Sequence, residues 1–215
     1  LIFKDIVRNV DVLVENFKPG TMRKLGLDYK TLSKSFPKLI YASCSGFGQT
    51  GPWADKPAYD VIVQALGGIM SLTGNEGDSP IRVGSSIGDI TAGLFTVIGI
   101  QSAIIHRNNT AKGSFIDVSM LDCQVAILEN AIARYSSNRE VPKKLGSRHP
   151  SISPFESYKC KDNYIVIAAG NDTLFKKLCA ALGAKEIEKN SFFSTNDLRL
   201  HNADKLKVKI EKILS

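Results

Sequence analysis

Residues 11–44 read DVLVENFKPGTMRKLGLDYKTLSKSFPKLIYASC, and this stretch decides the fold class. Its two ends, 11–15 and 39–44, are short runs of apolar and β-branched residues, a composition that favours strands. Gly and Pro residues and apolar positions at helical spacing lie between the two runs. A strand, a helical crossover and a second strand make a βαβ step, so the first half of the chain is predicted to be α/β.

Strand and helix patterns continue along the chain, and the composition changes once. The predicted elements are helices at 59–72 and 87–107, a strand at 115–118 and a helix at 121–135. Residues 138–154 are rich in Pro, Ser and basic residues, which is typical of a linker. A second unit is predicted to follow, with a hairpin that turns at 161–163 and then helices at 172–182 and 197–214.

Composition narrows the class of protein. With 215 residues, 43% hydrophobic and 23% charged, the chain is long and apolar enough to bury a core. Its most apolar stretch, 87–105, is interrupted by Asp89, Gln101 and glycines, so we do not expect a membrane span. The four cysteines lie far apart without CxxC spacing, and no histidine stands at zinc-site spacing. Neither a metal site nor a disulfide framework is indicated, which fits the cytoplasm or an organelle matrix.

The formal charge of +7 suggests an anionic partner, but charge alone does not separate nucleic acid from a phosphorylated small molecule. Much of the excess lysine lies in KKLG at 143–146 and near the C-terminus, where a solvated helix face is the ordinary explanation. A stacking platform for nucleic acid needs aromatic side chains interleaved with basic ones, and the C-terminal lysines have few aromatics nearby. Nucleic acid is therefore not expected as a partner.

Asp89 stands between a run of small residues, 84–88, and a long apolar helical pattern. One interpretation is a helix N-cap, worth about 1 kcal/mol of stability. The other is a reactive carboxylate, because the glycines at 84 and 88 leave the nearby backbone open to a ligand. Spacing alone does not choose between the two.

Two further segments have the composition of binding loops. In ENFKPGTMRKLG, 15–26, a Pro-Gly turn leads into a helix whose free N–H groups and basic residues suit an anion, and an ordinary βα turn is the alternative. In GFGQTGPWADKPAYD, 46–60, two glycines have the spacing of a dinucleotide loop, but the expected third glycine precedes a proline rather than a helix. We expect this loop to line a pocket with backbone amides and the Gln49 side chain.

Several segments, taken together, carry a family resemblance. They are VLVENFKPGTMRKLGLDY, GFGQTGPWADKPAYDVIVQALGG, VGSSIGDITAGLFTVIGI and KGSFIDVSMLDCQVA, in this order. The set resembles the family III CoA-transferases, also called the carnitine dehydratase and bile-acid-inducible group, over nearly the whole chain. The resemblance implies part of a Rossmann-like, CoA-binding large domain at 1–137, a linker at 138–154 and the start of a smaller α+β domain at 155–215. It also implies a fragment of a protein that forms interlocked homodimers at full length.

The resemblance implies roles for single residues. Asp89 matches the aspartate that becomes acylated, and Tyr59 matches an aromatic residue near the acyl group. The residues expected beside CoA are Asn16, Phe17, Thr21, Lys24, Leu25 and Met120. CoA and acyl-CoA are substrates in this scheme, and neither a metal nor a tightly bound cofactor is implied. The expected location is the cytoplasm, or the mitochondrial matrix in a eukaryote.

The expected reaction moves CoA from an acyl-CoA donor to a carboxylic acid acceptor. A carboxylate nucleophile can form an acyl anhydride, release CoA thiolate and then become an aspartyl-CoA thioester with little net change in free energy. An α-methylacyl-CoA racemase-like or other CoA-ester activity on the same fold is the alternative.

Two departures from the family pattern bear on the choice of reaction and acid. The racemase branch carries a histidine where this chain has Tyr59, and the chain's three histidines lie outside the matched motifs, which favours transfer. Relatives specialised for oxalate carry a multi-glycine loop where this chain has GSRHPSISPF, so formate and oxalate are not the expected acids.

Overall fold

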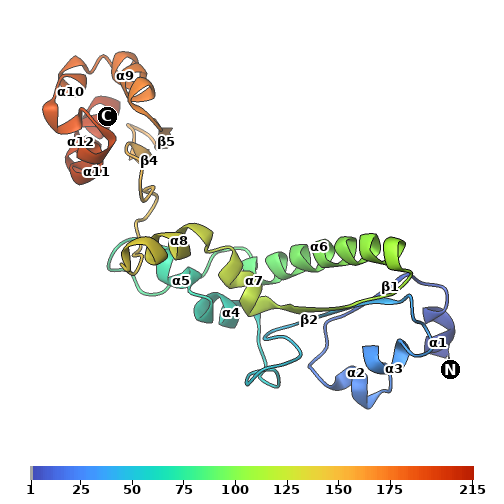
Figure 1. Cartoon of the computed structure of the whole chain (residues 1–215). Helices are drawn as coiled ribbons and strands as arrows, with labels where there is room; N and C mark the ends of the chain where they lie inside the picture. The colour runs from blue at the N-terminus through green and yellow to red at the C-terminus, as the bar shows by residue number, and fades with distance from the viewer. Residues whose placement is uncertain (1) are drawn as a thin grey trace. The chain divides into compact units, whose positions relative to one another are not determined.

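The computed structural model describes residues 2–215 and divides them into two compact units (Figure 1). The first unit runs up to Thr73 and again from Ser79 to Lys143, and the second comprises Gly74–Asp78 and Lys144–Ser215. The segment expected to be a linker is split by this division. Its residues from 144 onward pack with the second unit, where the His149 N–H donates to the Phe155 carbonyl at 2.9 Å.

A three-stranded parallel sheet lies at the centre of the first unit. The strands are β1 (Val12–Glu15), β2 (Ile40–Ser45) and β3 (Phe115–Ser119), in the order β1-β2-β3. Val12 is in register with Ile40, and the parallel pairing of β1 with β2 confirms the predicted βαβ step. The α/β fold class expected from the sequence is confirmed.

The crossover from β1 to β2 is made of two single-turn helices, α2 (Thr21–Lys24) and α3 (Tyr29–Leu32). Asp28 begins α3 by accepting the Thr31 N–H at 2.9 Å, which is ordinary side-chain capping. Together with α1 (Ile2–Val7), the crossover covers one end of the sheet with a cluster of buried side chains: Val7, Leu13, Met22, Leu32, Leu39 and Tyr41.

The long helix α6 (Ile87–Thr110) runs along the sheet and packs on β2 and β3 (Figure 1). It approaches β3 closely at Gly99, where an added Cβ would lie 2.9 Å from Cγ2 of Ile116. By length and composition alone α6 is apolar enough to cross a membrane, so the interruptions in its sequence do not by themselves exclude a span. The core helix of a water-soluble protein meets the same criteria, and 28% of the most apolar window is buried here.

Two predicted helices of the first unit are each broken into two, as is the helix predicted at 197–214 in the second unit, which forms α11 (Asn196–His201) and α12 (Ala203–Leu214). The pattern at 59–72 forms α4 (Asp60–Leu66) and α5 (Ile69–Leu72), because Gly68 adopts a left-handed φ of 94° that ends the first helix. The pattern at 121–135 forms α7 (Met120–Ala126) and α8 (Glu129–Asn138). Apolar periodicity runs across both breaks, so it could not reveal them.

The second unit opens with the predicted hairpin. Strands β4 (Phe155–Lys159) and β5 (Tyr164–Ala168) pair antiparallel, and the Cys160 N–H donates to the Asn163 carbonyl at 2.7 Å across the turn. The helical elements that follow are α9 (Asp172–Ala181), α10 (Lys185–Glu188), a 3-10 turn at Ser191–Phe193, α11 (Asn196–His201) and α12 (Ala203–Leu214).

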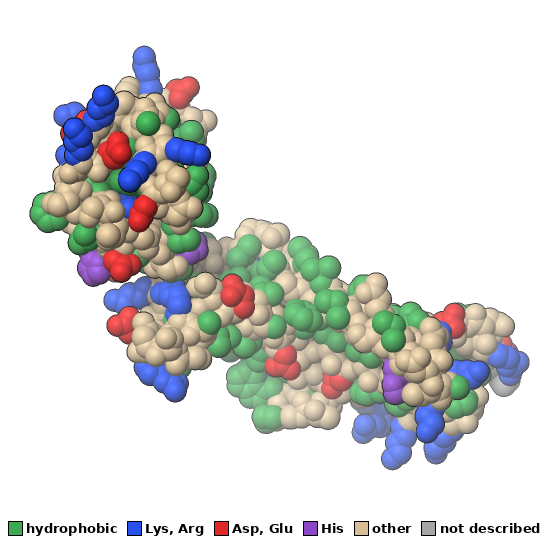
Figure 2. Space-filling model, turned by 45° about the horizontal axis from the view of Figure 1, so that its top comes forward, with side chains coloured by type: hydrophobic (Ala, Val, Ile, Leu, Met, Phe, Trp, Pro, Cys, Tyr) green, Lys and Arg blue, Asp and Glu red, His purple; other side chains and the backbone are tan. Residues whose placement is uncertain are grey.

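The core of the second unit packs α9, α10 and α12 on the hairpin around Tyr158, Phe175, Leu206 and Ile210. On the face of the second unit that Figure 2 shows, Lys and Arg side chains are dispersed over the surface with acidic groups among them. This distribution is the solvated surface expected from the sequence.

Candidate active site

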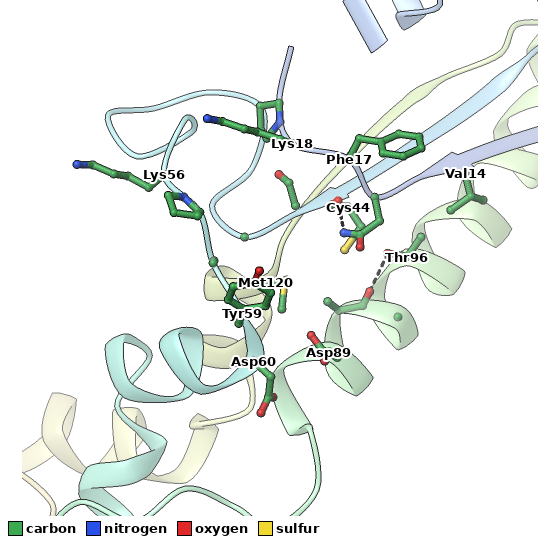
Figure 3. Close-up of a pocket in the computed structure, with 18 of the residues that line it drawn as sticks. Val14, Phe17, Lys18, Cys44, Lys56, Tyr59, Asp60, Asp89, Thr96 and Met120 are labelled. Carbon is green, nitrogen blue, oxygen red and sulfur yellow. Dashed lines mark hydrogen bonds between the residues drawn. The ribbon is translucent and has the colours of Figure 1, made fainter. Parts of the chain in front are cut away.

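A cavity of about 850 Å³ lies in the first unit. It opens where β1 and β2 end and where α4 and α6 begin (Figure 3). The carboxyl ends of parallel strands are the usual position of ligand sites in open α/β sheets. Each strand end contributes to the wall: Asn16 and Phe17 follow β1, Cys44 and Ser45 end β2, and Met120 follows β3.

Asp89 faces this cavity from the first turn of α6 (Figure 3). The interpretation of Asp89 as an N-cap is wrong, because α6 begins at Ile87 and the cap position is occupied by Ser86. Within residues 2–215, no hydrogen bond or ion pair is made to the Asp89 carboxylate. Partial withdrawal from water, followed by the negative charge of Asp60, raises the pKa of Asp89 above its ordinary value. The side chain is exposed, and hence available for chemistry.

Hydrogen bonds hold the turn after β1 against β2. Asn16 Nδ2 donates to the Cys44 carbonyl at 2.7 Å, and the Phe17 N–H donates to Glu15 at 2.8 Å. The buried Glu15 carboxylate also accepts the hydroxyl of Ser43. This network fixes the backbone that presents Asn16 and Phe17 to the cavity.

The structure brings together most of the residues singled out from the sequence and separates others from them. Asn16, Phe17, Tyr59 and Met120 line the cavity with Asp89. The remaining expected CoA residues, Thr21, Lys24 and Leu25, are on α2 or directly after it and do not line this cavity.

The Gln49 side chain is also directed elsewhere. Its Nε2 donates to Ser43 Oγ at 2.8 Å, and it lines a separate cavity of about 260 Å³ with Glu15 and Tyr41. The place of Gln49 is therefore set by a bond to a strand residue that the sequence pattern did not indicate.

The start of α2 offers less to an anion than the sequence indicated. The helix is a single turn, and the Thr21 N–H is already engaged by the Lys18 carbonyl at 3.0 Å.

Among the amides near 84–88, the Ile87 N–H donates to Ser85 and the Gly88 N–H to Asp60. Neither of these two donors is therefore available to a reacting oxyanion.

Sequence reasoning missed several residues of the cavity wall, above all Lys18, Lys56, Cys44 and Asp60. The two lysines were visible in the motifs, next to Phe17 and close before Tyr59, but their charge was not connected with the site. Burial, ahead of the nearby carboxylates, raises the pKa of the Cys44 thiol, which therefore stays protonated near neutrality. This leaves Asp89 as the stronger candidate nucleophile.

Over the described part of the chain, no group of three or more His, Cys, Asp or Glu side chains is placed to hold a metal ion.

Comparison with known proteins gives a consistent assignment. The family model described as CoA-transferase family III matches residues 1–215. The chain is 48% identical to an acetyl-CoA:oxalate CoA-transferase of Acetobacter aceti over 215 residues, which are all of this chain and 55% of that protein. It is 41% identical to a succinate–glutarate CoA-transferase of Agrobacterium fabrum, over all of this chain and 52% of that protein.

A solved structure agrees with these matches. A CAIB/BAIF family protein from Brucella suis superimposes with a TM-score of 0.86 at 41% identity, over 99% of this chain and 56% of that one. The chain thus spans about half the length of the relatives it matches. The motifs, the parallel sheet and the full-length family match lead to one assignment: the chain belongs to the CoA-transferase family III.

Proposed function

We propose that the protein transfers CoA between an acyl-CoA donor and a carboxylic acid acceptor, with the Asp89 carboxylate as the nucleophile. The observation that carries the proposal is a carboxylate without hydrogen-bond or ion-pair partners in residues 2–215, facing a cavity large enough for a ligand. Family membership supports the same chemistry, and the matched relatives are named as CoA-transferases.

The reaction runs through two covalent states of Asp89. A carboxylate oxygen attacks the thioester carbonyl of acyl-CoA, the C–S bond breaks, and CoA leaves as the thiolate, giving an aspartyl acyl-anhydride. The thiolate then attacks the Asp89 carbonyl carbon, which releases the donor acid and forms an aspartyl-CoA thioester. The acceptor carboxylate then attacks the aspartyl-CoA thioester and releases CoA thiolate, which gives a second anhydride. The thiolate attacks the acceptor's carbonyl in that anhydride, forms the new acyl-CoA and frees the Asp89 carboxylate. Asp89 attacks in its ionised form, which the first turn of α6 stabilises against the burial and the Asp60 charge that raise its pKa.

The remaining residues hold the substrates in this scheme. Asn16, Phe17 and Met120 line the path of CoA, and Tyr59 borders the acyl group. Thr21, Lys24 and Leu25 serve the nucleotide end outside the cavity, and Gln49 acts in the acyl pocket only if its bond to Ser43 opens. The homodimeric state and cytoplasmic location belong to the same proposal.

The acid is proposed to be a dicarboxylate. The two relatives are named for oxalate and for succinate and glutarate, and each of these acids has a second carboxylate. Lys18 and Lys56 line the cavity and supply positive charge for a carboxylate that does not react, or for a phosphate of CoA. The relative named for oxalate counts against the earlier exclusion of that acid, which rested on a missing glycine-rich loop.

The racemase-like alternative lacks support in the cavity. It needs an acid or base on each face of the substrate α-carbon. No histidine is found among the described residues that line the cavity, and the second carboxylate of its wall, Asp60, is engaged by the Gly88 N–H and by Gln64.

Trapping of the covalent intermediate tests the nucleophile. The complete gene product is incubated with acetyl-CoA or succinyl-CoA, and mass spectrometry is used to find an adduct on the peptide VGSSIGDITAGLF, which hydroxylamine should convert to a hydroxamate. Asp89→Asn should lower turnover by several orders of magnitude while folding and CoA binding persist. Substantial turnover by the Asn variant, with deamidation excluded by mass spectrometry, would refute the assignment.

A panel of acceptors tests the acid. Acetate is compared with oxalate, succinate and glutarate in the same assay. The proposal expects the dicarboxylates to be the better acceptors, and a preference for acetate contradicts it.

A further inference from the structure

The helix that carries Asp89 does not begin with a cap of its own. Among the described residues, no hydrogen bond from the Ser86 side chain caps α6. A carboxylate from another helix takes that place, since Asp60 Oδ1 accepts the Gly88 N–H at 2.9 Å. Asp60 is 8% exposed, and it is the first residue of α4. The start of α6 is thus fixed by a residue 28 positions earlier in the chain.

A second side chain of α4 holds the Asp60 carboxylate in this orientation. Gln64 Nε2 donates to Asp60 Oδ2 at 2.7 Å, and Gln64 Oε1 accepts the Val83 N–H at 2.8 Å. Gln64 is fully buried. The two side chains together anchor the segment that leads into α6, and each oxygen of Asp60 is held by a hydrogen bond.

The contact between the two helices leaves no room at Gly88. A Cβ built there would lie 2.6 Å from Val63 Cγ2 and 3.1 Å from Asp60 Oδ1. Only glycine permits this approach, and Asp89 is the next residue. The Asp60 carboxylate therefore stands beside the backbone of the proposed nucleophile. The residue belongs to the wall of the same cavity, but its carboxylate points away from the cavity (Figure 3).

We infer that Asp60 is a positioning residue for Asp89, which fixes the first turn of α6 and favours the acylated over the free carboxylate. The inference rests on the proposed function. When Asp89 attacks a thioester, its negative charge leaves with the CoA thiolate and the anhydride is neutral. A fixed negative charge nearby destabilises the free carboxylate and not the anhydride, so it shifts the equilibrium toward acylation.

Two observations agree with this role. Asp60 contributes, after burial, to the raised pKa of Asp89. The cation nearest to Asp60 is Arg82, whose Nη1 lies 3.8 Å from Oδ2 on a side chain that is 52% exposed. A long contact to an exposed guanidinium is weak, so Arg82 leaves most of the Asp60 charge in place.

The test compares adduct formation with CoA binding in the complete gene product. Asp60→Asn keeps an oxygen that accepts the Gly88 N–H and removes the charge. Acetyl-CoA or succinyl-CoA, whichever labels the wild type, is supplied without acceptor, and the covalent fraction is measured by intact mass spectrometry. We expect the equilibrium ratio of adduct to free enzyme to fall about tenfold, the equivalent of one pKa unit. The affinity for free CoA, measured by calorimetry, should change less than about twofold.

Controls separate charge from folding. Asp55→Asn removes an exposed carboxylate from the preceding loop and should leave the adduct ratio unchanged. If Asp60→Asn does not fold, the double variant Asp60→Asn with Gln64→Met removes the amide donor that would face the new side chain, adds no charge and carries the same test. Reduced CoA affinity with an unchanged adduct ratio would assign Asp60 to substrate binding and overturn the inference.

The outcomes also separate this inference from the proposed function. An adduct ratio equal to that of the wild type in a folded Asp60→Asn variant overturns the positioning role and leaves Asp89 as the nucleophile. Absence of any adduct in the wild type with either donor removes the proposed function and this inference with it. A tenfold fall in adduct with intact CoA binding supports both.

Discussion

The start of α6 in the first unit is built differently from two helix starts of the second unit. In the second unit, α9 begins with Asn171, whose side chain accepts the Leu174 N–H at 2.9 Å, and α11 begins with Thr195 in the same manner. In the first unit, α6 takes its cap from Asp60 on α4. The carboxylate in its first turn stays free of partners within residues 2–215. A local cap serves stability alone, whereas a remote cap leaves the nearby side chain available for chemistry.

The two units also differ in whether a key charged side chain has hydrogen-bond and ion-pair partners. The guanidinium of Arg199 is fully buried in the second unit and is satisfied by Asp172 at 2.7 Å and by the carbonyls of Ser153 and Phe193. Asp89 in the first unit has no such partners among the described residues. Each unit is therefore expected to respond to mutation in its own way, the second in stability and the first in reactivity.

The largest effect on stability is expected at Arg199. Replacing it with Met leaves two buried carbonyls without donors, which should lower the free energy of unfolding by about 3 kcal/mol. Urea unfolding, with hydrogen exchange to locate the loss in residues 144–215, measures it. Lys177→Met, at an exposed position, is the control and should change little. Equal losses in the two variants would show that the satisfied charge does not stabilise the second unit.

The next effect is expected at Gly88. An added methyl group would press on Val63 and displace the start of α6, so Gly88→Ala should lower turnover about a hundredfold, as small misplacements of a reactive group do. Gly84→Ala is the matched control, because a Cβ at Gly84 meets nothing within 4 Å. Steady-state kinetics on the complete gene product measures both variants. Normal turnover by Gly88→Ala would mean that the seating of α6 on α4 does not position Asp89.

A smaller effect is expected at the local cap of α9. Asn171→Ala removes the bond to the Leu174 N–H and should cost about 1 kcal/mol of stability without affecting turnover. Thermal or urea unfolding checks the first part and the transferase assay the second. A large loss of turnover would contradict the separation of the two units' roles.

The smallest effect is expected at Ser86. Because its side chain makes no cap bond within the described structure, Ser86→Ala should change the free energy of unfolding by less than about 0.5 kcal/mol. The same unfolding assay compares it with Asn171→Ala. A cost near 1 kcal/mol would show that α6 is capped by its own residue after all.

The elements that could be predicted from the sequence are those specified by local signals. The strands of the βαβ step and the hairpin were located because their composition and turns lie within a few residues of each other. The break at Gly68 was missed because apolar periodicity continues across it. Two interpretations of Asp89 remained open, as the cap of α6 or as a reactive carboxylate, because the residue that caps the helix, Asp60, is remote in sequence.

The residues of the candidate site were likewise predicted correctly in part. Residues within the motifs, such as Asn16, Tyr59 and Asp89, do line one cavity. Gln49 was expected beside them, but its direction depends on a bond to Ser43 that no spacing rule contains. The orientation of such a side chain depends on contacts between elements that are apart in the sequence. Local patterns in a single sequence do not reveal these contacts.

The alternation of side chains along β1 has a consequence for how this protein can change over evolutionary time. Val14 and Asn16 line the cavity of Asp89, while Glu15 lines the second cavity on the other side of the strand. Point substitutions at these positions alter one wall at a time. The insertion or deletion of one residue would exchange the two sets and move the Glu15 carboxylate into the cavity of Asp89. Descendants of this chain should therefore vary by substitution at 12–16 while keeping the length of that segment.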